Sequence, residues 1–137
     1  MSFAVYLIDT NVVSELRKPR PNPKVIAWIQ GAEDPALHLS AVTIGEIQAG
    51  IEVTRTQNPA KAEELEAWAA QVADSYHVLA MDAACFRRWA KLMHRQSSTV
   101  YEDAMIAATA LVHRLTVVTR NVRDFSRFGV PVLNPFE

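Results

Sequence analysis

Short apolar runs alternate with longer segments of helical periodicity along the chain. The first run, Ala4 to Ile8, is continuously apolar and ends abruptly at Asp9-Thr10-Asn11. This pattern predicts a buried parallel strand followed by the start of a helix, because each of the three polar residues can cap one. Further strands are predicted at Leu37 to Leu39, Val78 to Met81, Thr116 to Thr119 and Val132-Leu133.

The intervening segments carry apolar side chains at helical spacing. They are Val12 to Leu16, Val25 to Ile29, the segment after Ser40 up to Val53, Pro59 to Tyr76, Phe86 to Met93 and Ala104 to Val112. The last is apolar nearly all round, so we expect it within the core. A polar turn is expected from Arg120 to Asp124. Strands that alternate with helices predict an α/β fold with a mainly parallel central sheet of about four to five strands.

Length and composition indicate one globular domain over residues 1–137. Half of the residues are hydrophobic and 21% are charged, and Gly and Pro are few, which excludes disordered and fibrous classes. The single cysteine, Cys85, has no CxxC partner, so spacing excludes a disulfide framework and a thiolate zinc site and predicts a buried thiol. No ligand-spaced pair occurs among the histidines, so none is assigned a role: His38, His77, His94 and His113.

Two features of the chain indicate a cytoplasmic protein that is not bound to a membrane. No apolar stretch approaches the roughly 20 residues of a membrane span. The N-terminus lacks the basic region and the cleavage site of a secretory signal. A net charge of −1 argues against a surface that is basic throughout.

Four acidic residues are expected to meet at one edge of the predicted sheet. Asp9 comes directly after the first strand, and Asp124 follows the strand Thr116 to Thr119 through a short polar turn. Glu46 and Asp103 are expected in the first turns of helices that begin at the same edge. In an open parallel sheet, ligands bind beyond the carboxyl ends of the strands, near a switch in strand order.

Carboxylates that lie close together repel one another, and without a cation at least one would hold a proton through a raised pKa. A site with only oxygen ligands prefers Mg²⁺ or Mn²⁺ over zinc. Such an ion can lower the pKa of a water molecule and neutralise charge on a phosphate, which is the chemistry of phosphodiester hydrolysis. The remaining surface is then slightly basic, because the cations outnumber the other acids.

Each acid also has a purely structural interpretation. Asp9 could serve only as a helix cap, and Glu46 could close a capping box with Thr43. Asp103 could simply favour the positive end of its helix, and Asp124 could be a turn residue. No one of these residues decides the function.

Several segments together resemble the PIN-domain toxins of the VapC and FitB kind. These segments are Asp9 to Leu16 (DTNVVSEL), Ser40 to Gly50 (SAVTIGEIQAG), Asp103 to Ala110 (DAMIAATA), Val118 to Phe125 (VTRNVRDF) and the ending VPVLNP. They occur in the same order and span nearly the whole chain. The resemblance implies an α/β/α sandwich, Mg²⁺- or Mn²⁺-dependent cleavage of RNA, a homodimer, and inhibition by a small cognate antitoxin.

The resemblance also assigns residues. It implies that the metal ligands and catalytic acids are Asp9, Glu46, Asp103 and Asp124. It further implies that the polar residues that support these acids or bind the substrate are Thr10, Asn11, Thr119 and Asn121. The approach to Asp103, from Gln96 to Glu102, lacks the short Pro- or Gly-containing loop of the family. Glu102 or Asp103 could then face the metal, and the helical phase favours Asp103, with Glu102 solvated.

Seven cations are predicted near the rim of the site, where they could track a phosphate backbone or simply be solvated. They are Arg17, Lys18, Arg20, Lys24, Arg120, Arg123 and Arg127. An amphipathic inhibitor segment could bind helices that carry Val12, Val13 and Leu16, or Ile47 and Ile51.

Two functions other than RNA cleavage fit part of this sequence pattern. A phosphatase with an aspartyl-phosphate intermediate would have a second acid two residues after Asp9, where this chain has Asn11. A catalytically silent PIN-like module that binds RNA or protein is the stronger alternative.

Overall fold

The computed structural model describes residues 4–137, with every side chain among them except that of Asp34. Five parallel strands form one sheet in the order β3-β2-β1-β4-β5. The strands are β1 (Tyr6–Ile8), β2 (Leu37–Ser40), β3 (His77–Leu79), β4 (Thr116–Val118) and β5 (Val132–Leu133). The predicted mainly parallel α/β fold is therefore confirmed.

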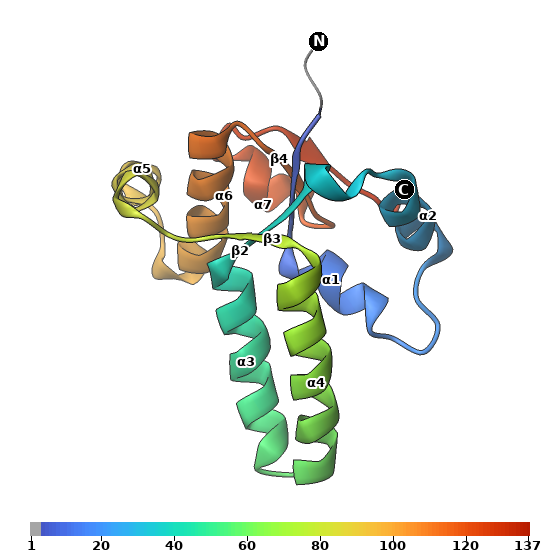
Figure 1. Ribbon diagram of the computed structural model, residues 1–137. Coiled ribbons are helices and arrows are strands. Elements are labelled where there is room, and N and C mark those ends of the chain that lie inside the picture. The colour runs from blue at the N-terminus through green and yellow to red at the C-terminus, as the bar shows by residue number, and fades with distance from the viewer. Residues whose placement is uncertain (1–3) are drawn as a thin grey trace.

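Helices connect the strands and cover both faces of the sheet (Figure 1). They are α1 (Thr10–Leu16), α2 (Pro23–Gly31), α3 (Ala41–Arg55), α4 (Pro59–Ser75), α5 (Ala83–Met93), α6 (Tyr101–His113) and α7 (Val122–Ser126). Two single turns of 3-10 helix, η1 (Asp34–Ala36) and η2 (Ser98–Val100), complete the chain. In Figure 1, α3 and α4 run side by side as an arm that projects away from the sheet.

The core consists of two clusters, one on each face of the sheet. Ile8 belongs to the cluster that the α1, α2, α3 and α4 helices cover, whereas its neighbour Leu7 belongs to the cluster under α6 and α7. Successive side chains of a strand point to opposite faces, so a central strand with helices on both faces must be apolar at every position. This explains the unbroken apolar run before Asp9. The nearly all-apolar α6 is buried at Ala104 and from Ile106 to Ala110, as predicted.

Three local predictions from the sequence are wrong. The segment from Arg120 to Asp124, predicted as a polar turn, enters the short helix α7. The third strand lies at His77–Leu79 rather than Val78 to Met81. Phe86, predicted on the core face of its helix, is 45% exposed.

The start of α3 also differs from the capping box that Thr43 and Glu46 could have formed. Ser40 is the N-cap, and its Oγ accepts a hydrogen bond of 3.0 Å from the backbone N–H of Val42. Thr43 is therefore a buried residue inside the helix, and Glu46 lies in the second turn rather than the first.

No helix within residues 4–137 has both the length and the apolarity that crossing a membrane requires.

Candidate active site

The strand order reverses between β1 and β4, which is where an open parallel sheet binds ligands. The chain moves from β1 to β2 on one side, and β4 later adds to the other side of β1. Beyond the carboxyl ends of these strands begin α1, α3 and α7, directly or after a few residues. The fold therefore brings the starts of three separate helices to one edge; the starts of α1 and α3 were predicted there, and α7 stands where a turn was predicted.

Asp9 occupies the centre of this edge. It is the N-cap of α1 and is only 4% exposed. Its Oδ1 accepts a hydrogen bond of 2.8 Å from the backbone N–H of Thr10, and its Oδ2 accepts one of 2.8 Å from the Thr119 hydroxyl. Burial is the main cause that raises the pKa of the Asp9 carboxyl, and these two hydrogen bonds oppose it. The cap role and the site role thus coexist in one residue.

Asn11 of α1 and Thr119, which directly follows β4, hold the Asp9 carboxylate in place. The Asn11 side-chain amide donates to Asp9 Oδ2 and to Thr119 Oγ1, each at 3.2 Å, and its carbonyl oxygen accepts from the backbone N–H of Arg120. The Thr119 hydroxyl also accepts from the backbone N–H of Asn121 at 2.9 Å. Asn121 contributes its backbone to this network, and its side chain is exposed.

Thr10 links α1 to the Glu46 carboxylate of α3. Its hydroxyl donates to Glu46 Oε1 at 2.9 Å and lies 3.0 Å from the Thr43 hydroxyl. Thr43 was not predicted as part of the site. The available signal was its spacing from Glu46, since residues three apart lie on one face of a helix.

Electrostatic interactions join the four acids that the sequence singled out. The pKa of Asp103 is raised to about 6, first by burial and then by the charges of Asp9, Asp124 and Glu102. The pKa of Glu46 is raised by burial first, and the charges of Asp9, Glu102 and Asp103 add to the effect. Asp103 is half-buried and Glu102 is exposed, as the helical phase predicted.

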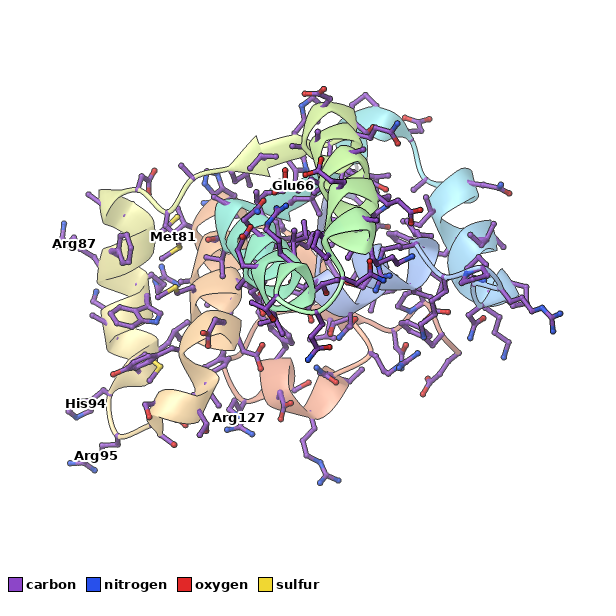
Figure 2. All side chains as sticks on the ribbon, turned by 90° about the horizontal axis from the view of Figure 1, so that it is seen from below. Glu66, Met81, Arg87, His94, Arg95 and Arg127 are labelled. Carbon is purple, nitrogen blue, oxygen red and sulfur yellow. The ribbon has the colours of Figure 1, made fainter. Side chains whose placement is uncertain are left out.

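Asp124 lies at the rim of the group. It is on α7, its side chain is 44% exposed, and Arg127 Nη2 lies 3.2 Å from its Oδ1. Figure 2 shows Arg127 beside α7, on the side that faces the lower end of α6. Arg127 also partly offsets the negative charge around Asp103.

The donor set suits a hard divalent cation. All four acids offer oxygen, and within residues 4–137 no Lys or Arg side chain pairs with Asp9, Glu46 or Asp103. Among these described residues, no three of the four carboxylates place oxygen atoms within 4.8 Å of one another. Burial first, and repulsion between carboxylates second, raise the pKa values of Glu46 and Asp103, and a cation bound among them would oppose both effects.

The predicted rim cations are all exposed, and several have partners. Lys18 lies 2.9 Å from Glu15, an acid that is buried despite its charge, and Arg120 lies 3.6 Å from the same carboxylate. Arg17 stacks over the ring of Trp68 at 5.9 Å. Arg17 also shares a cavity of about 190 Å³ with Thr10 and Glu46. Among the four acids, Arg127 thus pairs with Asp124, and Arg17 shares a cavity with Glu46.

Comparison with known proteins identifies the family that this sequence matches and the proteins that it resembles. A family model described as the PIN domain matches residues 6–131. The VapC ribonuclease Y4jK of Sinorhizobium fredii is 34% identical over 96% of this chain and 97% of its own length. The crystal structure of FitAcB from Neisseria gonorrhoeae aligns with a TM-score of 0.86 and 31% identity, over 97% of this chain and 99% of that chain.

A solved toxin-antitoxin complex from Klebsiella pneumoniae is a further structural neighbour. It aligns with a TM-score of 0.73 and 25% identity, over 96% of this chain and 98% of that chain.

Proposed function

This chain belongs to the PIN-domain family, and from that premise we propose that it is the ribonuclease toxin of a toxin-antitoxin pair and cleaves RNA with a divalent metal ion. The observation that carries the proposal is the meeting of four acids, from four different elements, at the switch point of the sheet. The ribonuclease relative covers nearly the whole chain, which supports the reaction class.

Asp9, Glu46, Asp103 and Asp124 are the proposed ligands of Mg²⁺ or Mn²⁺. A cation bound there would lower the pKa of a water molecule and neutralise charge on the scissile phosphate. Asn11 and Thr119 orient the Asp9 carboxylate, and Thr10 holds Glu46 toward it. Because these supporting groups are neutral donors, they fix the carboxylates without neutralising them, which preserves the negative charge for a cation.

RNA is the proposed substrate, and exposed cations beside the acids could contact its backbone. Arg17 is the C-cap of α1 and shares a cavity with Glu46, and Arg120 follows β4 and donates its backbone N–H to Asn11. Arg120 also stacks over Phe136 at 3.9 Å, so its guanidinium has a defined position. Substitution of either arginine should weaken RNA binding and its dependence on salt.

Two protein partners belong to the proposal. The solved toxin-antitoxin complex supports a cognate antitoxin.

A homodimer is supported by an exposed aromatic patch, which we define as Phe86, Trp89 and Tyr101. Phe86 and Tyr101 are 45% and 44% exposed, and each ring packs against Trp89. Aromatic side chains are enriched in interfaces, so Phe86→Glu should lower the mass measured by light scattering from dimer to monomer.

The nuclease assay uses purified chain, labelled RNA and millimolar Mn²⁺ or Mg²⁺. We expect cleavage by the wild type, none in EDTA, and none by Asp9→Asn or Asp103→Asn, because each change removes a charged ligand and keeps its volume. Asp74→Asn is the matched control, since Asp74 is exposed on α4 and has no partner in the described residues. Full activity in EDTA, or in both site variants, would refute the mechanism.

A second readout separates catalysis from metal binding. Millimolar Mg²⁺ or Mn²⁺ should raise the melting temperature of the wild type and of Asp74→Asn, because a ligand that binds only the folded state stabilises it by mass action. The increase should be much smaller in Asp9→Asn. Folded wild type that binds RNA and never cleaves it would instead identify a silent PIN-like module.

A further inference from the structure

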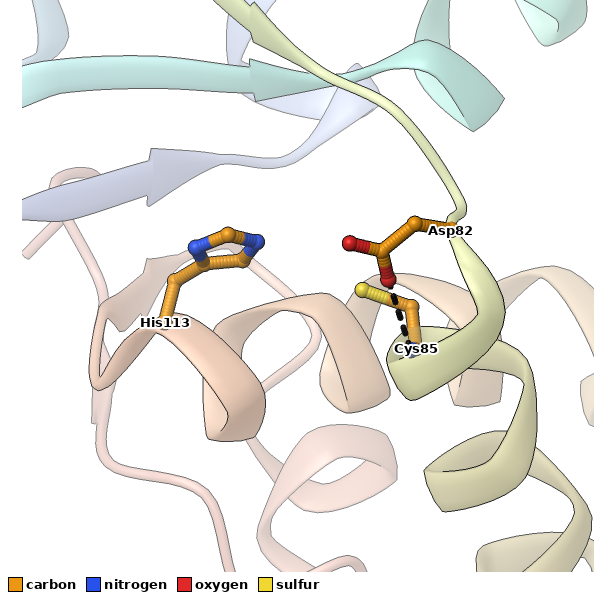
Figure 3. Close-up of side chains that lie close together, drawn as sticks. All are labelled: Asp82, Cys85 and His113. Atoms are coloured by element: carbon orange, nitrogen blue, oxygen red, sulfur yellow. Dashed lines mark hydrogen bonds between the residues drawn. The ribbon is translucent and has the colours of Figure 1, made fainter.

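A second group of metal-ligating side chains lies between α5 and α6. Asp82, Cys85 and His113 each place one ligand atom so that all three atoms lie within 4.8 Å of one another. Figure 3 shows the sulfur, the carboxylate and the imidazole ring facing a common space. Spacing along the chain argued against a thiolate zinc site, but the fold supplies the third ligand from a segment 28 residues away.

Local structure explains why the three side chains converge. Asp82 is the N-cap of α5, and its Oδ1 accepts a hydrogen bond of 2.9 Å from the backbone N–H of Cys85. Cys85 is fully buried, as the sequence predicted. His113 is the last residue of α6, and the chain leaves that helix through Arg114 in the left-handed conformation, with φ of 58°.

The structural roles of these residues leave their ligand atoms available. The helix cap uses one oxygen of Asp82 and leaves the other, and the buried sulfur of Cys85 lies within 4.8 Å of the ligand atoms of Asp82 and His113. The imidazole of His113 makes no hydrogen bond within residues 4–137. An imidazole that makes no hydrogen bond and faces a carboxylate and a thiol is free to bind a metal ion through its ring nitrogen.

We propose that Asp82, Cys85 and His113 form a zinc site with three protein ligands and a water molecule in the fourth position. Sulfur and imidazole ligands select zinc over Mg²⁺ or Mn²⁺, and three protein ligands with a water molecule in the fourth position are the arrangement of catalytic zinc sites. The cysteine binds as a thiolate, and its proton leaves to solvent. One carboxylate and one thiolate balance the two charges of the ion.

Binding requires small side-chain movements. Tetrahedral zinc with bonds of about 2.0 to 2.3 Å places its ligand atoms roughly 3.3 to 3.8 Å apart. Asp82 and His113 are exposed and can approach the buried sulfur from the solvent side. The ion would then join the start of α5 to the end of α6.

The site is separate from the acidic one. His113 and Asp103 lie at opposite ends of α6, and ten residues of helix span about 15 Å. The proposal therefore does not depend on the proposed nuclease function, and its test does not use nuclease activity.

The test titrates metal-free, reduced protein with Co²⁺, the spectroscopic substitute for zinc, in excess Mg²⁺. Because the chain has a single cysteine, absorption from sulfur-to-cobalt charge transfer reports on this site alone. We expect one equivalent of Co²⁺ to produce the band and Zn²⁺ to displace it. His113→Gln should weaken binding by more than about tenfold, since loss of even an outer partner of a metal ligand costs about 10- to 100-fold.

His94→Gln is the matched control, because His94 is an exposed histidine at the other end of α5 (Figure 2). It should bind Co²⁺ as the wild type does. Asp82→Asn keeps a capping oxygen and should also weaken binding, so the test does not rely on a Cys85 variant that fails to fold. Absence of the charge-transfer band in the wild type, or equal affinity in His113→Gln and His94→Gln, would overturn the proposal.

Discussion

Asp9 is a buried carboxylate whose hydrogen bonds all come from neutral donors. The backbone of Thr10, the hydroxyl of Thr119 and the amide of Asn11 hold both oxygens. Such donors stabilise the ionised form less than a cation would, and burial still raises the pKa of the group. The residue is thus oriented while its charge stays uncompensated, which is the state a metal ligand needs before the metal arrives.

Thr119→Val should destabilise the protein, because valine keeps the shape and removes the hydroxyl. Asp9 Oδ2 then loses its 2.8 Å donor and the backbone N–H of Asn121 loses its acceptor. Loss of one partner of a buried polar group lowers the free energy of unfolding by about 1 to 3 kcal/mol, which urea denaturation measures. Thr119→Ser retains the hydroxyl and should lose less. A serine variant as unstable as the valine variant would show that packing, not the hydrogen bond, matters here.

Asp103 should make the metal-free protein less stable as the pH rises. Its pKa is about 6 in the folded chain against an ordinary value of 3.8. The folded state therefore holds the proton more tightly than the unfolded state. Its contribution to stability is fully present below pH 3.8 and is lost by about pH 6.

Asp103→Asn does not titrate, so in EDTA its melting temperature should exceed that of the wild type above pH 6, and the difference should shrink toward pH 4. Thermal melts across this range measure it. Asp74→Asn should track the wild type throughout. A constant difference between Asp103→Asn and the wild type at all pH values would rule out titration of Asp103 as the cause.

Among the helices and strands, the sequence predicted those whose apolar side chains repeat with a clear period. The buried strands and the long helices α3, α4 and α6 have clear apolar patterns, so their positions were predicted within a few residues. The five-residue helix α7 is too short to show a period, and its Arg123 and Asp124 are typical of a turn. The sequence predicted that the four acids lie near one another because the elements that carry them were expected to meet at one edge, although Glu46 lies in the second turn of α3 and not the first. The hydrogen bonds of Thr43 were not predicted, because they depend on how α3 packs against α1.

Ser40 links the end of β2 to the start of α3, which carries Glu46. Its Oγ satisfies the N–H of Val42 at 3.0 Å, and the residue is fully buried. Ser40→Ala should lower the free energy of unfolding by about 1 kcal/mol, whereas Ser40→Gly should cost only a few tenths. Urea denaturation of the two variants measures this difference. Equal losses in alanine and glycine would show that the cap contributes little here.

Across the whole molecule, the acidic site continues into the surface of the α3–α4 arm. The cavity beside Thr10 and Glu46 extends to Leu65 and Trp68 of α4. Of the apolar contacts expected for an inhibitor, Val12 and Val13 are buried in the core and lie outside this cavity. Ile47 and Ile51 line the cavity. Leu65 and Trp68 are half-buried and line the cavity together with Ile47. Carboxylates and an apolar cavity thus adjoin on one surface.

This combination predicts how a cognate antitoxin inhibits the chain. We expect an antitoxin segment that places an Arg at the acids and an apolar side chain in the cavity beside Trp68. A guanidinium pairs bidentately with a carboxylate, so it would occupy the oxygens that otherwise bind a cation. An exposed ion pair contributes only about 0 to 1 kcal/mol, so the apolar contact must supply much of the affinity.

Calorimetry with the co-expressed antitoxin, separated and refolded, measures both contributions. Glu46→Gln and Trp68→Ala should each weaken binding, Asp74→Asn should not, and replacement of the antitoxin Arg by Ala should relieve inhibition. Millimolar Mn²⁺ should lower the affinity of the wild type, because the cation and the guanidinium compete for the same oxygens. An antitoxin that still inhibits and binds Glu46→Gln, Trp68→Ala and wild type with equal affinity would act at another surface, and the blocking mechanism would be wrong.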